Sequence, residues 1–179
     1  LSEPILKGIW NDQQMLEMLF TTLSFKKWFI EIDEFDRAER RLLNFGHTWG
    51  HALESATSFS IPHGIAVVVG MMSSIRFIDE NPSCDALWKH CLLILKDVLD
   101  LQQLEYFDVK SFQVAFSSDK KHSRGQYHLI VPAIDDLELL GVKEIEIPAK
   151  ESSMIKITEA IVDTISILKK EIKKNISIL

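Results

Sequence analysis

The segment that decides how this chain folds reads Arg40-Arg41-Leu42-Leu43-Asn44-Phe45-Gly46-His47-Thr48-Trp49-Gly50-His51-Ala52-Leu53-Glu54. Apolar residues recur in it at helical spacing, and the pattern predicts a helix over residues 38–57. On a helix that turns by about 100° per residue, four polar side chains share a sector of about 60°: Arg40, Asn44, His47 and His51. A cation, an amide and two imidazoles would then project together from one helix face.

Two glycines, Gly46 and Gly50, interrupt the same segment. Each costs about 1 kcal/mol of helix propensity relative to alanine. Glycine at such positions is typical of a close approach by another backbone or by a ligand. We therefore expect a tight contact along this stretch.

A metal site is suggested by three histidines. His47 and His51 are four residues apart, a spacing that can place two imidazoles on one metal ion. Such a pair on a helix is more often packed or solvated, so the spacing alone is weak support. A third histidine, His63, lies twelve residues further on, between Pro62 and Gly64. Three histidines beside an arginine and an asparagine are hard to explain as core packing.

The rest of the chain is mainly helical as far as about residue 116, with predicted helices over residues 12–31, 64–79 and 85–99. Strand patterns follow at 126–131 and 142–147. A last apolar stripe predicts a final helix and comprises Ile161, Ile165, Leu168 and Ile172. The predicted fold class is therefore mainly α, a single helical domain over residues 1–179 with a small β element.

Composition excludes several classes of protein. The 179 residues are 46% apolar and 26% charged, which suffices for a core. A net charge of −6 without a basic stripe argues against nucleic acid, and no apolar run is long enough for a membrane helix. No Gly-rich dinucleotide-binding turn follows a strand. Cys84 and Cys91 form no CxxC pair, so we expect buried thiols in a cytoplasmic protein without a leader.

The motif of residues 40–54, followed by Pro62-His63-Gly64-x-Ala66-Val67-x-x-Gly70-Met71, resembles the signature of 3-dehydroquinate synthase and related sugar-phosphate cyclases. Asp119-Lys120-Lys121 is similar to the family's Asp-Lys-Lys segment. The resemblance spans roughly residues 20–132. It implies the C-terminal, metal- and substrate-binding domain of a lyase, acting with an N-terminal NAD-binding domain that is absent from this chain.

The resemblance also implies a metal site. By this likeness His47 and His63 bind the catalytic divalent metal, usually zinc or cobalt. His51 and Asn44 face the phosphate region of the substrate. With two histidines alone, the isolated chain should bind metal weakly.

Further roles follow from the same likeness. Lys26 and Arg40 are expected near the substrate carboxylate, because a guanidinium matches a carboxylate with two parallel bonds. Lys120 or Lys121 meets the phosphate, and the sequence does not choose between them. Asp36 stands where the family commonly has glutamate, one methylene shorter.

The chain departs from the family pattern in two places. Ile65 stands where the family commonly has a glutamate after His-Gly, so a carboxylate that orients the imidazole of His63 is missing or comes from elsewhere. The family's third metal ligand is a glutamate upstream of this region. Glu3 superficially resembles that glutamate, but the number of residues between Glu3 and Lys26 is short for the family pattern.

The implied activity is NAD- and metal-dependent elimination of phosphate from a seven-carbon sugar phosphate, with closure of a carbocycle. This reaction belongs to the shikimate pathway of aromatic amino acid biosynthesis. A homodimer is expected for the full-length enzyme, and the isolated domain is expected to be inactive. Two alternatives remain: the helical domain of a metal-dependent polyol or alcohol dehydrogenase, and a non-catalytic remnant module.

Overall fold

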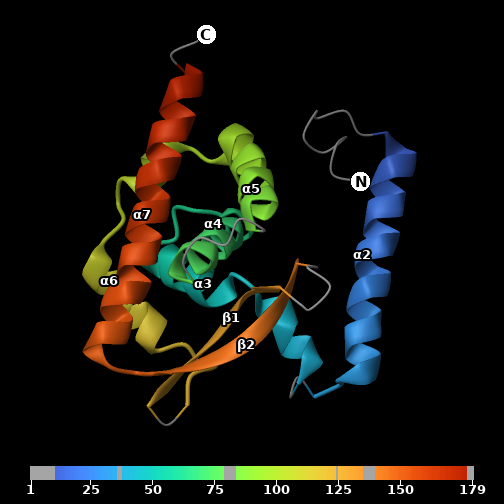
Figure 1. Cartoon of the computed structure of the whole chain (residues 1–179). Helices are drawn as coiled ribbons and strands as arrows, with labels where there is room; N and C mark the ends of the chain where they lie inside the picture. Colours follow the sequence, from blue (N-terminus) through green and yellow to red (C-terminus); the bar gives the residue numbers. More distant parts are fainter. Residues whose placement is uncertain (1–10, 36–37, 79–83, 124, 135–139, 177–179) are drawn as a thin grey trace. The chain divides into compact units, whose positions relative to one another are not determined.

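The computed structural model describes residues 11–35, 38–78, 84–123, 125–134 and 140–176 (Figure 1). The chain divides into two compact units, Leu1–Leu43 and Asn44–Leu179. Whether it acts as a single domain stays a prediction.

The first unit contains helix α2, Asp12–Ile32, which confirms the helix predicted over 12–31. The helix begins with a capping box, in which the Asn11 side chain accepts from the Gln14 backbone N–H and the Gln14 side chain accepts from the Asn11 backbone N–H. Its C-cap is Asp33, whose Oδ2 accepts from the backbone N–H groups of Ala38 at 2.8 Å and Arg40 at 3.2 Å. This carboxylate therefore ties the C-terminal end of α2 to the start of the next element.

The continuous helix predicted over 38–57 is wrong. Residues Glu39–Asn44 form a 3-10 helix, η1, and α3 begins only at His47 and runs to Ala56. Between them Gly46 adopts a left-handed conformation with φ +79°, which breaks the helical path. Arg40 and Asn44 therefore do not share one helix face with the two histidines of α3.

The second unit is built around α4, His63–Phe77, which confirms the helix predicted over 64–79. This helix contacts α3, α5, β1 and α7. The remaining helices are α5 (Asp85–Val98), which confirms the prediction for 85–99, η3 (Leu101–Leu104), α6 (Val109–Ser117) and α7 (Glu151–Ile176). In α7 the predicted stripe is buried at all four positions.

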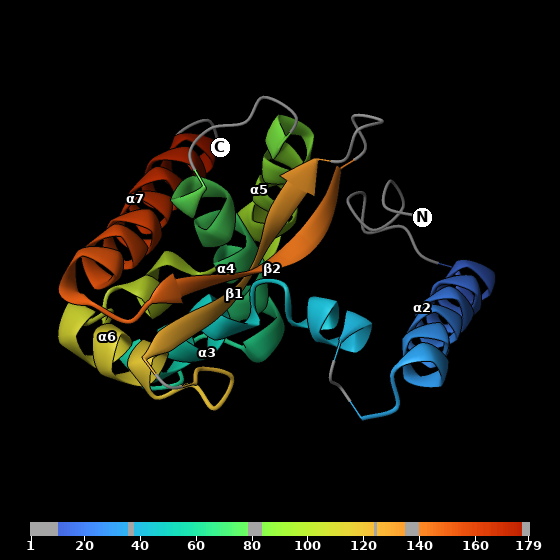
Figure 2. The ribbon, with the colours of Figure 1, turned by 60° about the horizontal axis from the view of Figure 1, so that its bottom comes forward.

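The two predicted strands are confirmed and extend further than expected. Strands β1, Gln126–Ile134, and β2, Leu140–Pro148, pair antiparallel with Gln126 opposite Pro148. Alternate residues of β1 enter the core: Tyr127, Leu129 and Val131. Figure 2 shows the hairpin lying against the helices, and β1 contacts α4.

Helices dominate the described chain, so the mainly α fold with a small β element is confirmed. Cys84 and Cys91 are buried free thiols, as expected, and burial raises the pKa of Cys91 to about 11. Among the residues described, no helix combines the length and the apolarity that crossing a membrane would need.

Candidate metal and substrate site

The three histidines of the motif meet at the crossing of α3 and α4. Ring centroids lie 5.6 Å apart for His47 and His51, 5.4 Å for His47 and His63, and 5.5 Å for His51 and His63. Two imidazoles on one tetrahedral ion have centroids about 5 Å apart, because each metal–nitrogen bond is about 2.0–2.1 Å. The spacing of the rings therefore suits a shared metal ion.

Glycines make this crossing possible. A Cβ placed at Gly50 would lie 3.1 Å from the Ala66 carbonyl oxygen, and one placed at Gly70 would lie 2.8 Å from the Gly50 nitrogen. At Gly46 a Cβ would come within 2.5 Å of the Val67 carbonyl oxygen. The close approach expected from Gly46 and Gly50 is thus confirmed, and the approaching group is the backbone of α4.

Hydrogen bonds set the proton position on two of the rings. Nδ1 of His47 donates to the Phe45 carbonyl oxygen at 3.3 Å, and Nδ1 of His63 donates to Oε2 of Glu54 at 3.2 Å. Both partners only accept, so the neutral rings carry their proton on Nδ1 and keep a lone pair on Nε2. Metal-binding histidines typically use their second nitrogen in this way. These residues therefore fit a divalent metal.

Glu54 is the site residue that the sequence did not single out. Among the residues that the structure describes, one group of three possible ligands brings its donor atoms within 4.8 Å of one another: His51, Glu54 and His63. His47 is outside this group, although its ring is close to both histidines. Two donor sets thus share His63: the expected pair with His47, and the set with His51 and Glu54. The signal in the sequence was Glu54 one helical turn after His51.

Electrostatics favour neutral imidazoles here. Burial lowers the pKa of His47 and of His51, and the positive charge of Lys121 lowers both further. Neutral imidazole is the form that binds metal. The Nζ atom of Lys121 is buried, whereas Lys120 is exposed. Of these two lysines, Lys121 is the one whose charge acts on the site histidines.

The other predicted site residues are placed as follows. Asn44 is half-buried at the end of η1, and Arg40 donates from Nη1 to the Glu34 carbonyl oxygen at 2.9 Å. Lys26 is exposed on α2 and, like Arg40, belongs to the unit Leu1–Leu43, whereas the three histidines belong to Asn44–Leu179. Asp36, like Glu3, lies outside the described residues.

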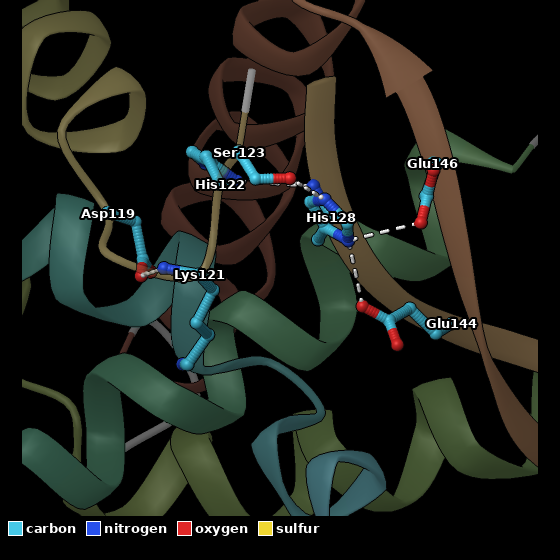
Figure 3. Close-up of polar contacts among 7 residues, drawn as sticks. All are labelled: Asp119, Lys121, His122, Ser123, His128, Glu144 and Glu146. Carbon is cyan, nitrogen blue, oxygen red and sulfur yellow. Dashed lines mark hydrogen bonds and ion pairs between the residues drawn. The ribbon is translucent and has the colours of Figure 1, made fainter. Parts of the chain in front are cut away.

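A second polar cluster surrounds His128 on the hairpin (Figure 3). The Ser123 hydroxyl donates to His128 Nε2 at 2.8 Å, and His128 Nδ1 donates to Glu144 at 3.1 Å. The backbone N–H of His128 donates to His122 Nδ1 at 3.2 Å. Lys121 extends away from this cluster in the same view. Both ring nitrogens of His128 are engaged, which suits a structural role.

Comparison with known proteins places this geometry in context. Residues 4–122 match the family described as 3-dehydroquinate synthase C-terminal. The 3-dehydroquinate synthase of Saccharolobus solfataricus is 32% identical over 147 residues, which cover 77% of this chain and 40% of that protein. That of Rhodopseudomonas palustris (strain TIE-1) is 36% identical over 123 residues, covering 62% of this chain and 32% of that protein. The chain thus spans about two-fifths or less of these curated relatives.

Proposed function

Because the chain belongs to the 3-dehydroquinate synthase C-terminal family, we propose that it supplies the metal- and substrate-binding half of a sugar-phosphate cyclase. Its substrate is a seven-carbon sugar phosphate, which loses phosphate and closes to a carbocycle. NAD is held mainly by a separate NAD-binding domain, and the complete cytoplasmic enzyme is a homodimer. The chain itself takes no nucleic acid or membrane as partner.

One observation carries this proposal: three imidazoles lie together, two of them with proton positions suited to metal binding, and the charge of a lysine with a buried ammonium acts on the cluster. The rings of His47, His51 and His63 are within 5.6 Å of one another. The charge of Lys121 acts on His47 and His51. An anionic, oxygen-rich substrate would meet both metal ligands and a cation here, which is what phosphate elimination requires.

Each residue then has a proposed role. His47 and His63 hold the metal through Nε2, and a bound divalent ion supplies Lewis acidity toward the reacting oxygens. Lys121 binds the phosphate as a point charge, and His51 and Asn44 orient it for departure.

The substrate carboxylate is bound by Arg40 and Lys26 from the first unit. A guanidinium offers the bidentate fork that a carboxylate matches, and the ammonium of Lys26 adds a second positive charge. Asp36 supplies an acidic side chain four residues before Arg40 in the sequence. This side chain is one methylene shorter than the glutamate that the family commonly has there. These two cations favour a carboxylated substrate over a neutral sugar phosphate.

The proposal is tested by assaying the full-length protein with a seven-carbon sugar phosphate and NAD. Inorganic phosphate should be released without net NADH, because the hydride is returned within the cycle. Lys121→Met should lower kcat/KM by about 10- to 150-fold, the value of one charge-assisted hydrogen bond. Lys120→Met is the matched control and should leave kcat/KM close to the wild-type value.

Other outcomes would count against the cyclase. Steady accumulation of NADH on a simple polyol would indicate the metal-dependent dehydrogenase instead. If a folded, metal-loaded protein released no phosphate and formed no NADH, the non-catalytic module would be indicated. An equal loss of kcat/KM in both lysine variants would remove the assigned role of Lys121.

A further inference from the structure

We propose that Glu54 is a positioning residue that fixes the imidazole of His63 for metal binding. Its carboxylate accepts the Nδ1–H of His63 and so keeps the Nε2 lone pair available to the ion. The inference rests on the proposed function, because it assigns Glu54 a part in the same metal site. It also identifies a source, on α3, for the orienting carboxylate that Ile65 does not provide.

The contact between Glu54 and His63 restricts the His63 ring. Oε2 of Glu54 lies 3.2 Å from Nδ1 of His63, and the exposed fractions of the two side chains are 14% and 54%. Glu54 is therefore held within the last turns of α3, while the imidazole at the start of α4 stands largely in solvent. An exposed ring rotates readily about its side-chain bonds. The contact with a largely buried carboxylate restricts that rotation.

The same contact also determines which nitrogen of His63 carries the proton. An ionised carboxylate only accepts, so the bond to Glu54 requires a proton on Nδ1 of His63, which leaves Nε2 as the nitrogen that can present a lone pair. A carboxylate on that proton also raises the basicity of Nε2 toward a metal. His47 has the same arrangement with the Phe45 carbonyl oxygen as acceptor. Two imidazoles from different helices thus present Nε2, each held by its own acceptor.

The helix crossing explains why Glu54 reaches His63. Gly50 and Gly70 let the backbones of α3 and α4 approach so closely that no Cβ would fit at Gly70 without overlap. Glu54 lies one turn after Gly50, and His63 begins α4, so the crossing brings the end of one helix to the start of the other. The partner is positioned by two rigid elements rather than by a loop.

The alternative is that Glu54 is itself a metal ligand. His51, Glu54 and His63 bring their donor atoms within 4.8 Å of one another. Two histidines and one glutamate form a known donor set for catalytic zinc. In that arrangement His51 would be essential for metal binding and His47 would not. The two assignments therefore differ in which histidine variant loses the metal.

The first experiment needs no metal. Nitrogen-15 NMR of the imidazole side chains should show His63 as the Nδ1–H tautomer in the wild-type chain. Glu54→Gln, which keeps an acceptor oxygen, should retain that tautomer. Glu54→Leu should shift His63 toward the Nε2–H tautomer that free imidazole prefers. Glu105→Leu, which removes an exposed carboxylate of the same unit, is the control and should change nothing.

The second experiment is a cobalt(II) titration of the same variants, followed by absorbance and by calorimetry. Glu54→Leu should weaken cobalt affinity by about 10- to 100-fold, the range for partners that orient a ligand. Glu54→Gln should fall between wild type and Glu54→Leu, because a neutral acceptor makes the weaker hydrogen bond. Thermal unfolding followed by circular dichroism shows whether each variant remains folded.

The outcomes separate this inference from the proposed function. If Glu54→Leu changes neither tautomer nor affinity while His47→Ala and His63→Ala abolish binding, the positioning role is overturned and the metal site stands. If His51→Ala abolishes binding and His47→Ala does not, Glu54 is a ligand and the inference is wrong. If no histidine variant affects cobalt binding, the proposed metal site itself fails.

Discussion

At the residue scale, His122 shows how burial controls a histidine outside the metal site. Its ring packs against Tyr127 and Phe116, with centroids 4.8 Å and 5.4 Å apart. Its Nδ1 accepts the backbone N–H of His128 in strand β1 at 3.2 Å. Protonation of Nδ1 would break this bond and place a charge among aromatic rings. Burial accordingly lowers the pKa of His122, although Asp119 acts in the opposite direction.

The lowered pKa predicts the sign of one pH effect. Because the pKa of His122 is lower in the folded chain than its ordinary value of 6.5, the unfolded chain takes up the proton first as pH falls. The stabilising contribution is therefore present above about pH 6.5 and is lost as pH falls through the folded-state pKa. NMR titration should give a His122 midpoint below 6.5. His122→Phe should reduce the fall in unfolding free energy below pH 6.5. A midpoint at or above 6.5 would contradict this account.

Individual site residues were predictable from the sequence where their spacing was local. His47 and His51 lie four residues apart on one helix, and His63 follows a proline at the next helix start. Glu54 was not predictable as a partner of His63, because the contact depends on how closely two helices cross. The choice between Lys120 and Lys121 likewise depends on the turn that follows α6, since adjacent residues point in different directions.

At the scale of elements, the contact between α3 and α4 is decided by glycines. A Cβ at Gly70 would overlap the Gly46 carbonyl oxygen and lie 2.8 Å from the Gly50 nitrogen. A Cβ at Gly64, in the first turn of the same helix, would meet nothing within 4 Å. The two positions therefore offer a matched pair within one helix.

Substitution by alanine should change the free energy of unfolding in opposite directions at Gly70 and Gly64. Gly70→Ala should lower the free energy of unfolding by about 1–3 kcal/mol, because α3 and α4 must move apart to admit the methyl group. Gly64→Ala should raise it by about 0.4–1 kcal/mol, because alanine restricts the unfolded chain and favours the helix. Urea unfolding of both variants measures these changes. Destabilisation of similar size at both positions would show that space at the crossing is not the cause.

The same crossing explains where the helix prediction failed. Local apolar spacing is helical through residues 38–57, and nothing in that spacing marks Gly46 as the end of an element. The break arises because the Gly46 backbone passes close to Val67, and a left-handed φ accommodates the passage. Strand and helix predictions elsewhere succeeded, because their periodicity agrees with the packing that the core imposes.

At the scale of the whole molecule, the core cluster formed by the described residues falls within one of the two units. Every buried member of the core cluster lies between Trp49 and Ile172. In α2, the only buried residue of the described helix is Phe29. Composition and periodicity predicted the mainly α class, because these depend on sums over many residues. They could not reveal a division at residue 43, since α2 carries the same apolar spacing as a core helix.

This division leads to a prediction that separates metal binding from substrate binding. A chain beginning at Asn44 retains the core and all three site histidines, so it should unfold cooperatively at a temperature close to that of the longer chain. Its cobalt affinity should also be unchanged. It lacks Lys26 and Arg40, so when combined with the NAD-binding domain it should bind a carboxylated sugar phosphate much more weakly. Circular dichroism melts and cobalt titration check the first two outcomes, and calorimetry with substrate checks the third.

Loss of cooperative unfolding on truncation would mean that α2 is part of the same cooperative unit. Unchanged substrate affinity would remove Arg40 and Lys26 from the carboxylate site.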